Sequence, residues 1–377
     1  MTILFLISAG VLFHAYFGYP LSLALLRLLR GDRSRHAQGD DLPSVSLVIS
    51  AHNEDRVIRR KIENSLDLEY PRDRLTIIVA SDGSTDGTEA IVREFQGRGV
   101  ELRTFEGRRG KVDCLNLVVP GLRSELVVMS DANSIYERDS LQRLVRHFAD
   151  PRVGCVCGRL RYVNPRDLPA GHGELLYWEY EDGIKRLESS LGSLLGANGA
   201  MYAYRRDLFR TVDPLMFCDD VVPARIALDG YLTLFDPQAL CTEETVGEEV
   251  ERRRRARHAS FGLRSMLHVA GEALRRGRLL LLYECLAHRI LRWGGGLALA
   301  ALFVSAWWLQ TPWRLLALAG QTLFYGTAIA GYLASRRGRR ITALYLPYYF
   351  LVINLAGLAG LRAYILGTDK PYWSPRR

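Results

Sequence analysis

Carboxylate and carboxamide side chains stand directly after three short apolar runs of the sequence. They are Asn53 and Glu54 after residues 45–50, Asp82 after residues 75–80, and Asp131 and Asn133 after residues 125–130. Short apolar runs indicate buried strands, and the carboxyl ends of parallel strands meet at the sheet edge where ligands bind. Asp131 and Asn133 offer two oxygen side chains to a hard divalent cation. The sequence therefore predicts a ligand site that includes a cation at this edge.

The residues between these runs favour helices, which would connect the strands. Helical patterns cover residues 55–68 and 137–149, and another helix begins near Asp86, with Glu89 placed to complete its cap. The polar turn 81–87 contains two glycines, which permit positive φ beside a helix N-terminus. Alternation of this kind over residues 43–250 predicts an α/β domain with a mostly parallel sheet.

The pattern changes after Asp150, where further elements would complete the domain. The expected strands are 153–162, 201–204 and 231–235, and the expected helices are 174–190 and 218–229. Asn198 lies in the glycine-rich turn 196–200, and the sequence leaves open whether it lines an acceptor pocket or holds the turn. A block of arginines at 252–257 follows a run of acids at 243–251.

Charge and cysteine content narrow the class of protein. The chain has 377 residues and a formal net charge of +9, and its basic residues gather beside apolar spans. Membrane topology explains such clusters, and no fingerprint of a nucleic-acid-binding fold is present, so no nucleic-acid partner is expected. The 6 cysteines include no Cys-x-x-Cys pair, which predicts free thiols in a reducing compartment.

Four apolar segments are long enough to be considered as membrane spans. They cover residues 3–26, 294–311, 314–334 and 344–366. No basic residue precedes the first segment, whereas Arg27, Arg30 and Arg33 follow it, which is the reverse of a signal peptide. We therefore expect a retained anchor with its N-terminus outside and the next domain in the cytoplasm.

The C-terminal segments leave two points open. If they cross in turn, Lys370, Arg376 and Arg377 lie outside, which opposes the positive-inside tendency. Either the last segment is re-entrant or the short tail overrides the rule. Leu279–Trp293 combines a leucine run with a histidine and two arginines, which predicts an interfacial amphipathic helix, with a full span as the alternative.

Five sequence blocks between these flanks occur in an order that is typical of one family. They are Ser50-Ala-His-Asn-Glu54, Ser81-Asp-Gly-Ser-Thr-Asp86, Gly110-Lys-Val-Asp-Cys-Leu-Asn116, Ser130-Asp-Ala-Asn133, and Cys218-Asp-Asp220 followed by the arginine block. Over residues 43–265 the chain resembles the membrane-anchored bacterial branch of the family 2 glycosyltransferases. That resemblance implies a Rossmann-like GT-A fold between N- and C-terminal transmembrane helices. It also implies an inverting transfer from a nucleotide diphosphate sugar, expected to be a UDP-sugar, with Mg²⁺ or Mn²⁺.

The resemblance assigns a role to each matching position of this sequence. Asn53, Glu54 and Asp82 would bind the nucleoside, Lys111 the diphosphate, Asp131 with Asn133 the cation, and Arg257 the donor. Asp220 would be the catalytic base, with Asp219 as its competitor or as an acceptor contact. Two departures stand out: Asn133 replaces the second acid of Asp-x-Asp, and Arg254 and His258 replace Gln and Trp of the Gln-x-x-Arg-Trp block of processive synthases.

Simpler roles compete with these assignments. Asp131 could cap the next helix, Asp82 could stabilise its own turn, and Asp220 could be an acid in the first turn of a helix. Lys111 could be a solvated surface lysine. Most of the arginine block could contact lipid headgroups, and we reserve ligand contact for Arg257.

The expected organisation is an anchor at 1–30, the glycosyltransferase domain at 43–265, interfacial helices at 266–293, a membrane region at 294–366 and a tail at 367–377. The expected protein is a multi-pass protein of the inner membrane that works on a lipid-linked or membrane-delivered acceptor in cell-envelope glycolipid or exopolysaccharide synthesis. Its partners would be the donor, the acceptor, membrane lipids and envelope-polysaccharide assembly proteins. A processive polysaccharide synthase and a non-catalytic nucleotide-binding scaffold are the alternatives.

Overall fold

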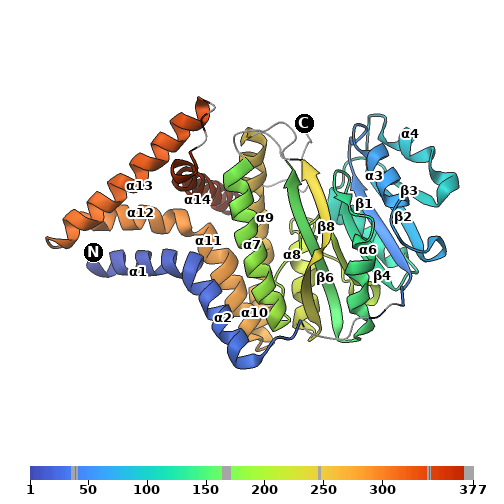
Figure 1. Cartoon of the computed structure of the whole chain (residues 1–377), viewed down its shortest axis with the longest axis horizontal. Coiled ribbons are helices and arrows are strands. Elements are labelled where there is room, and N and C mark those ends of the chain that lie inside the picture. The colour runs from blue at the N-terminus through green and yellow to red at the C-terminus, as the bar shows by residue number, and fades with distance from the viewer. Residues whose placement is uncertain are drawn as a thin grey trace.

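The computed structural model describes residues 1–34, 39, 41–163, 171–244, 248–337, 339 and 341–368. Within these residues, eight strands form one mixed sheet in the order β3-β2-β1-β4-β7-β6-β8-β5 (Figure 1). The strands are β1 Val45–Ala51, β2 Leu75–Asp82, β3 Val100–Phe105, β4 Leu126–Asp131, β5 Ile135–Tyr136, β6 Val153–Val163, β7 Tyr202–Arg205 and β8 Leu232–Glu244. β3, β2, β1 and β4 are parallel, and β6 is parallel to β8. β7 is antiparallel to both of its neighbours, and β5 is antiparallel to β8.

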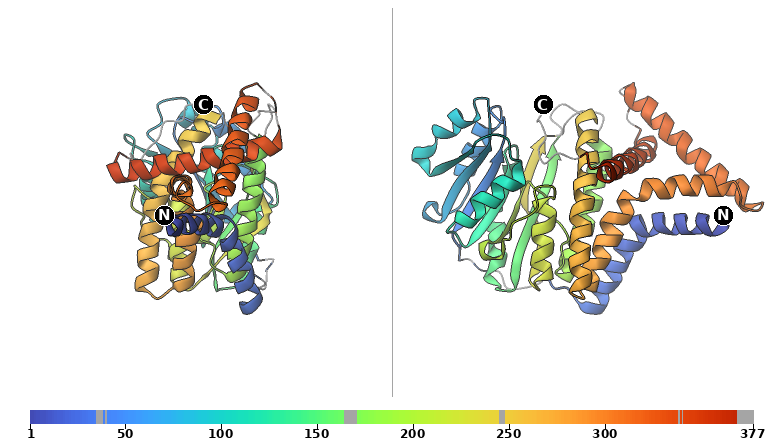
Figure 2. Two further views of the ribbon diagram at one scale, coloured as in Figure 1. Left: turned by 90° about the vertical axis from the view of Figure 1, so that its left-hand side faces the viewer. Right: turned by 180° about the vertical axis from the view of Figure 1, so that it is seen from behind.

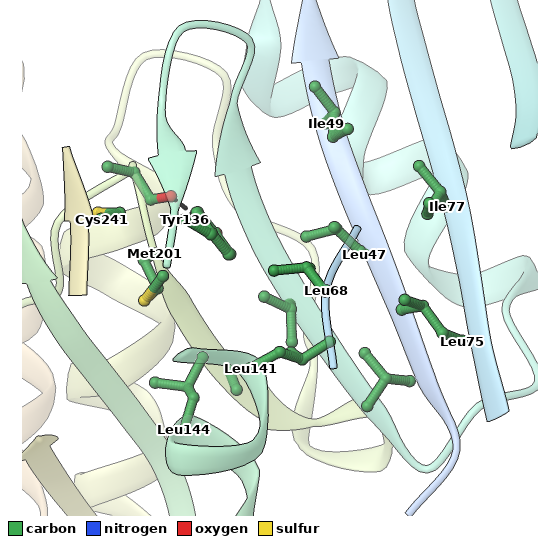
Figure 3. Close-up of a cluster of buried hydrophobic side chains, with 14 of the residues drawn as sticks. Leu47, Ile49, Leu68, Leu75, Ile77, Tyr136, Leu141, Leu144, Met201 and Cys241 are labelled. Carbon is green, nitrogen blue, oxygen red and sulfur yellow. Dashed lines mark hydrogen bonds between the residues drawn. The ribbon is translucent and has the colours of Figure 1, made fainter. Parts of the chain in front are cut away.

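Helices cover both faces of this sheet. They are α3 Ile58–Leu66, α4 Thr88–Arg93, α5 Lys111–Val118, α6 Ser140–Val145, α7 Gly171–Leu191, α8 Cys218–Leu228 and α9 Glu248–Arg275. Side chains alternate along each central strand, so Leu47 and Ile49 of β1 face α3, α4 and α6, whereas Val48 faces α5, α8 and α9. Figure 3 shows part of the first core, which includes Leu47 and Ile49 of β1 together with Leu141 and Leu144 of α6. The predicted mostly parallel α/β architecture is therefore confirmed.

The remaining helices lie on the side of α7 and α9 that faces away from the sheet (Figures 1 and 2). The N-terminal segment consists of α1 Thr2–Phe13, a π-helical turn at His14–Gly18 and α2 Tyr19–Arg30. At the other end of the chain, α10 Leu279–Glu284, a π-helical turn at Cys285–Ile290, α11 Leu291–Trp293 and α12 Gly295–Ala306 precede α13 Trp313–Arg336 and α14 Thr342–Leu366. α1 lies beside α12, and α2 lies beside α7. From this side of the molecule, α1, α12 and α13 project outward (Figures 1 and 2).

Two helices in the described part of the chain are long and apolar enough to cross a membrane, Thr2–Arg30 and Thr342–Leu366. A third candidate is the pair Leu279–Trp293 and Gly295–Ala306, whose axes are bent by 60°. The expected span at 314–334 is helical, as α13, but does not meet the same length-and-hydropathy criterion. Lys370, Arg376 and Arg377 lie outside the described residues.

Two expectations about the juxtamembrane region differ from the structure. The expected boundary at residue 265 falls inside α9, whose Phe261, Met266 and Val269 are buried in the core. Leu279–Trp293 does not present its basic residues outward, because His288 and Arg292 are 1% and 8% exposed against acidic partners on α7. This segment is therefore packed against the sheet domain, and the packed unit extends beyond residue 265.

Candidate active site

The loops after β1 and β2 are fastened to each other. Asn53 has a φ of 53°, and its side-chain Oδ1 accepts a hydrogen bond from the backbone N–H of Thr85 at 2.8 Å. The backbone N–H of Glu54 donates to Thr88 Oγ1 at 2.8 Å. Asn53 and Glu54 thus lie at the strand ends, as expected, and the carboxamide of Asn53 ties the loop after β1 to the loop after β2.

Asp82 fixes the loop that leads into α5. Its two carboxylate oxygens accept hydrogen bonds from the backbone N–H groups of Arg109 and Gly110, at 2.7 and 2.9 Å. Gly110 has a φ of 98°, a conformation that glycine adopts without strain. Because Lys111 follows at the first position of α5, Asp82 places that lysine. These contacts are made with the loop before α5, whereas the simpler role considered for Asp82 was to stabilise its own turn.

Lys111 and Asp131 form an ion pair where β4 ends. Lys111 Nζ lies 2.6 Å from Asp131 Oδ1, and both side chains are half-buried, 31% and 36% exposed. Burial alone would lower the pKa of Lys111, but the carboxylates of Asp131 and then Asp219 raise it above its usual value. The ammonium group of Lys111 is therefore held in its charged form beside the carboxylate. This partly buried ion pair argues against the simpler role of a solvated surface lysine.

The loop 193–201, which leads into β7, closes around these groups. Gly199 leaves room for three side chains, because a Cβ there would lie 3.1 Å from Lys111 Nζ, 3.2 Å from Asp219 Oδ2 and 3.3 Å from Asp131 Oδ2. A Cβ on Gly196 would lie 2.7 Å from Asp220 Oδ1. The backbone N–H of Ala197 donates to the carbonyl of Asp219 at 2.8 Å, which docks this loop on the start of α8. Residues far apart in the sequence thus surround one short loop.

Asp220 has an environment that suits a proton acceptor. Its side chain is 14% exposed, and Arg289 lies 4.0 Å from its Oδ1. Burial raises the pKa of Asp220 to about 6, Arg289 opposes that rise, and Asp219 adds to it. A carboxylate with such a pKa is ionised near neutral pH and is a stronger base than an exposed aspartate. Arg289 was not among the expected site residues.

Asn198 is engaged inside its own turn. Its side-chain Nδ2 donates to the carbonyl of Gly158 at 2.7 Å, and its Oδ1 accepts from the backbone N–H of Met201 at 2.8 Å. It is 8% exposed. Of the two roles left open by the sequence, these contacts favour holding the turn that contains Gly196 and Gly199. We do not propose Asn198 as an acceptor contact.

A buried lysine supports the segment that follows Asp131 and Asn133. Lys61 on α3 is fully buried, donates from Nζ to the carbonyl of Ser134 at 2.6 Å and lies 3.8 Å from the ring centroid of Tyr136. Burial lowers its pKa to about 7. Asn64, one turn later, exchanges two hydrogen bonds with the backbone of Tyr136 at 2.8 and 2.9 Å. The sequence signal that was overlooked is a lysine in the middle of the apolar face of a helix.

Arg257 lies on α9 near the start of α8. Its guanidinium carbon is 5.1 Å from the ring centroid of Phe261. The next residue, His258, stacks on Phe217, with ring centroids 4.8 Å apart, and Phe217 immediately precedes Cys218-Asp219-Asp220. The structure therefore puts the C-terminal end of the arginine block close to the segment that contains Asp220. Arg254 and Arg255 contact Tyr162 and Tyr349, at 2.8 and 2.6 Å between the guanidinium nitrogens and the hydroxyls.

The residues at the end of β4 fit a divalent cation only when a ligand completes its coordination. No group of three His, Cys, Asp or Glu side chains suited to a metal occurs in the described part of the chain. One carboxylate from Asp131 and one carboxamide oxygen from Asn133 suit a hard ion, but they supply two of its six or more ligands. Diphosphate oxygens would provide the others, which matches a cation that arrives with a nucleotide.

Comparisons with known proteins agree with this geometry. Residues 46–213 match the family model described as glycosyl transferase family 2. The poly-β-1,6-N-acetyl-D-glucosamine synthase of Staphylococcus epidermidis is 27% identical over 224 residues, 57% of this chain and 53% of the relative. That of Staphylococcus aureus (strain COL) is 26% identical over 217 residues, 55% of this chain and 52% of the relative. The chain thus spans about half the length of the curated relatives that it matches.

One solved structure is similar over nearly the whole chain. It is a mannosyltransferase from Pyrobaculum calidifontis, PcManGT, in complex with GDP-Man and Mn²⁺, with a TM-score of 0.73 and 25% sequence identity. The similarity covers 97% of this chain and 100% of that one, and so includes the terminal helices as well as the sheet. Together with the strand-end carboxylates and the matched family model, this shows that residues 46–213 form a glycosyltransferase family 2 domain with the GT-A fold.

Proposed function

We propose that this chain is an inverting, membrane-integral glycosyltransferase that moves a sugar from a nucleotide diphosphate donor to a lipid-linked or membrane-delivered acceptor. The observation that carries the proposal is the loop around Gly196 and Gly199. Gly199 lies against Lys111, Asp131 and Asp219, and Gly196 lies against Asp220, so donor-binding and base functions meet within four residues of backbone.

The proposed reaction needs a place for the charge that develops on the diphosphate. Lys111 and the divalent cation held by Asp131 and Asn133 would supply it, the cation acting as a Lewis acid toward the diphosphate. The positively charged Lys111 already lies 2.6 Å from Asp131, so the site is arranged for a negatively charged leaving group without a large rearrangement. Asn53, Glu54 and Asp82 would frame the nucleoside at the neighbouring strand ends.

The proposed base removes the proton of the acceptor. The acceptor oxygen forms a bond to the anomeric carbon while the bond from that carbon to the diphosphate oxygen breaks, and the nucleoside diphosphate leaves with the electron pair. Asp220 accepts the acceptor's proton as attack proceeds, and attack from the face opposite the diphosphate inverts the anomeric configuration. Asp219, which lies between Lys111 and Asp220, would orient the acceptor.

The terminal helices support an acceptor at the membrane. Outward-facing leucines and aromatic residues line α1, α12 and α14, whereas the sheet domain has an ordinary polar surface. We propose an inner-membrane location with the site on the cytoplasmic side, because arginines follow the first apolar segment. The pathway we propose is cell-envelope glycolipid or exopolysaccharide synthesis, in line with the polysaccharide synthases among the relatives.

Donor screening tests the proposal. Purified full-length protein in lipid nanodiscs should hydrolyse or transfer sugar from at least one of a panel of UDP- and GDP-linked sugars, with Mg²⁺ or Mn²⁺ present. GDP-mannose belongs in the panel because the solved structure that is similar over the whole chain contains it. If the wild-type protein turns over no donor but still binds nucleotide with metal, the non-catalytic scaffold becomes the better account.

A processive synthase remains the second candidate, because the curated relatives are polymer synthases. The replacement of the Gln-x-x-Arg-Trp block by Arg254, Arg257 and His258 favours a single transfer. Size analysis of the product separates the two: one added sugar per acceptor supports our proposal, and long polymer from the purified chain would overturn it.

A further inference from the structure

Glu188 is a buried carboxylate that joins three distant parts of the chain. It lies on α7 and is 1% exposed. Its Oε1 accepts a hydrogen bond from the hydroxyl of Tyr19 at 2.7 Å and lies 2.6 Å from Nδ1 of His288. Its Oε2 accepts from the backbone N–H of Leu195 at 3.2 Å. One side chain therefore contacts α2, the turn that precedes α11, and the loop next to the active site.

Glu188 reaches the active site through its third contact, the backbone N–H of Leu195. Leu195 precedes Gly196, where a Cβ would lie 2.7 Å from Asp220 Oδ1 and 3.2 Å from an Arg289 guanidinium nitrogen. A movement of the Leu195 N–H would move Gly196 with it. The hydrogen bond between Glu188 and Leu195 is therefore one of the contacts that hold this backbone in front of Asp220.

Two further contacts link the same juxtamembrane segment to the site. Glu284 on α10 accepts a hydrogen bond from Ser193 Oγ at 2.7 Å, at the start of the loop. Arg289 lies 4.0 Å from Asp220 Oδ1. Glu284, His288 and Arg289 all lie on the segment that leads into α12, so the placement of this segment affects the loop at two points and Asp220 at a third.

The carboxylate form of Glu188 is needed for this arrangement. An ionised carboxylate has two oxygens that only accept, and here they meet two or three donors. A glutamine at this position would keep one acceptor oxygen and turn an NH₂ group toward donors. The contact with Leu195 or the contacts with Tyr19 and His288 would then be lost, at the cost of a charge-assisted hydrogen bond.

We propose that Glu188 is a positioning residue that holds the loop 193–199 in front of Asp220 and couples this placement to the two chain segments that lead to the membrane helices. The proposal rests on the proposed glycosyl transfer. It predicts that the rate of transfer, and not the binding of nucleotide, responds to changes at Glu188.

The matched control is Glu181, seven residues earlier on the same helix. Glu181 is 3% exposed, lies 3.3 Å from Nε2 of the same His288 and pairs with Arg292 at 2.6 Å. The described contacts of Glu181 do not include the loop. Glu188→Gln and Glu181→Gln therefore remove the same charge from the same buried cluster, but only the first breaks the link that joins Leu195 to Tyr19 and His288.

The test measures kcat, donor KM and nucleotide affinity of both full-length variants in lipid nanodiscs, with melting temperatures for comparison. We expect Glu188→Gln to lower kcat by about ten- to a hundredfold with nucleotide affinity unchanged, and Glu181→Gln to keep kcat within about threefold at a similar melting temperature. Equal losses of kcat in the two variants, or wild-type kcat in Glu188→Gln, would overturn the proposal.

Two milder variants cover the case in which Glu188→Gln does not fold. Tyr19→Phe keeps the ring that stacks on His288, and Ser193→Ala removes only the hydrogen bond to Glu284. Each should lower kcat by about fivefold, the equivalent of one hydrogen bond, without weakening nucleotide binding. Unchanged kcat in both variants would overturn the proposal. Absence of any transfer by the wild-type protein would instead contradict the proposed function.

Discussion

The guanidinium of Arg289 lies 4.0 Å from the carboxylate of Asp220, although 69 residues separate them in the chain and Arg289 lies in the segment that leads to the membrane helices. This contact places a positive charge beside the proposed base. Burial and Asp219 raise the pKa of Asp220, Arg289 lowers it, and the balance is a pKa of about 6. The juxtamembrane segment is thus part of the environment that sets the pKa of the proposed base.

The pH dependence of transfer should report this balance. Because Asp220 must be ionised to accept a proton, kcat/KM should rise with pH through about 6 and then level off. Arg289→Met removes the charge that lowers the pKa of Asp220. The rise of kcat/KM with pH, which is the acid limb of the profile, should therefore occur at higher pH in this variant. Asp219→Asn removes a charge that raises the pKa, so its limb should move to lower pH.

The matched control for this experiment is Asp207→Asn, which removes an 82%-exposed carboxylate that pairs with Arg206. Its pH profile should coincide with that of the wild type. Shifts of Arg289→Met and Asp219→Asn in the same direction would show that Asp220 does not produce the limb.

Added methyl groups should test how closely the loop approaches the site. Gly196→Ala should lower kcat by about tenfold or more, because its Cβ would lie 2.7 Å from Asp220 Oδ1, too close for a real contact. Gly199→Ala should have a smaller effect, because its nearest atoms lie at 3.1 to 3.3 Å and one of them is the end of a flexible lysine. Gly97→Ala is the control, since no atom lies within 4 Å of its Cβ. If Gly196→Ala and Gly97→Ala are equally active, the loop does not confine Asp220.

A second carboxylate at position 133 should strengthen cation binding. Asn133 supplies an oxygen without charge, so Asn133→Asp should lower the Mn²⁺ concentration for half-maximal transfer, by about tenfold. Chelation with EDTA should abolish transfer by both proteins, and added Mn²⁺ should restore it. An unchanged Mn²⁺ requirement in Asn133→Asp would mean that this side chain does not face the ion.

Lys61 should matter for the cation without touching it. Lys61→Met removes the hydrogen bond to the Ser134 carbonyl, so the segment after Asp131 and Asn133 loses its support. We expect the Mn²⁺ requirement to rise by about tenfold or more. Arg59→Met on the same helix, at an exposed position, should leave it unchanged. If Lys61→Met requires the same Mn²⁺ concentration as the wild type, Lys61 does not support the cation site.

The sequence predicted those parts of the fold that depend on local patterns. The runs that became β1, β2 and β4 are almost wholly apolar, because helices cover both faces of the central strands. β3 was not predicted, since Val100–Phe105 lies at the edge of the sheet and alternates apolar with exposed polar residues. The last part of β8 was also missed, because Glu243 looked like part of an acidic run but is buried and accepts a hydrogen bond from Ser134 Oγ at 2.5 Å.

The site was predictable where a residue stands at the end of a strand, and unpredictable where its role depends on a distant partner. Lys111 and Asp131, 20 residues apart, meet as the strand pattern suggests. Arg289 and His288 could only look like interfacial basic residues, because their acidic partners lie about 69 to 107 residues away in the sequence. The packing of one helix against another decides the role of these two residues, and no local sequence pattern indicates such packing.

The substitution Asp220→Asn tests the central claim most directly, because it removes the proposed base and keeps the size of the side chain. The measurement is sugar transfer by the full-length protein in nanodiscs, together with the affinity for nucleoside diphosphate and Mn²⁺. We predict a loss of kcat of about a hundredfold or more with that affinity retained, while Asp207→Asn transfers at the wild-type rate. Transfer by Asp220→Asn at the wild-type rate would contradict the account.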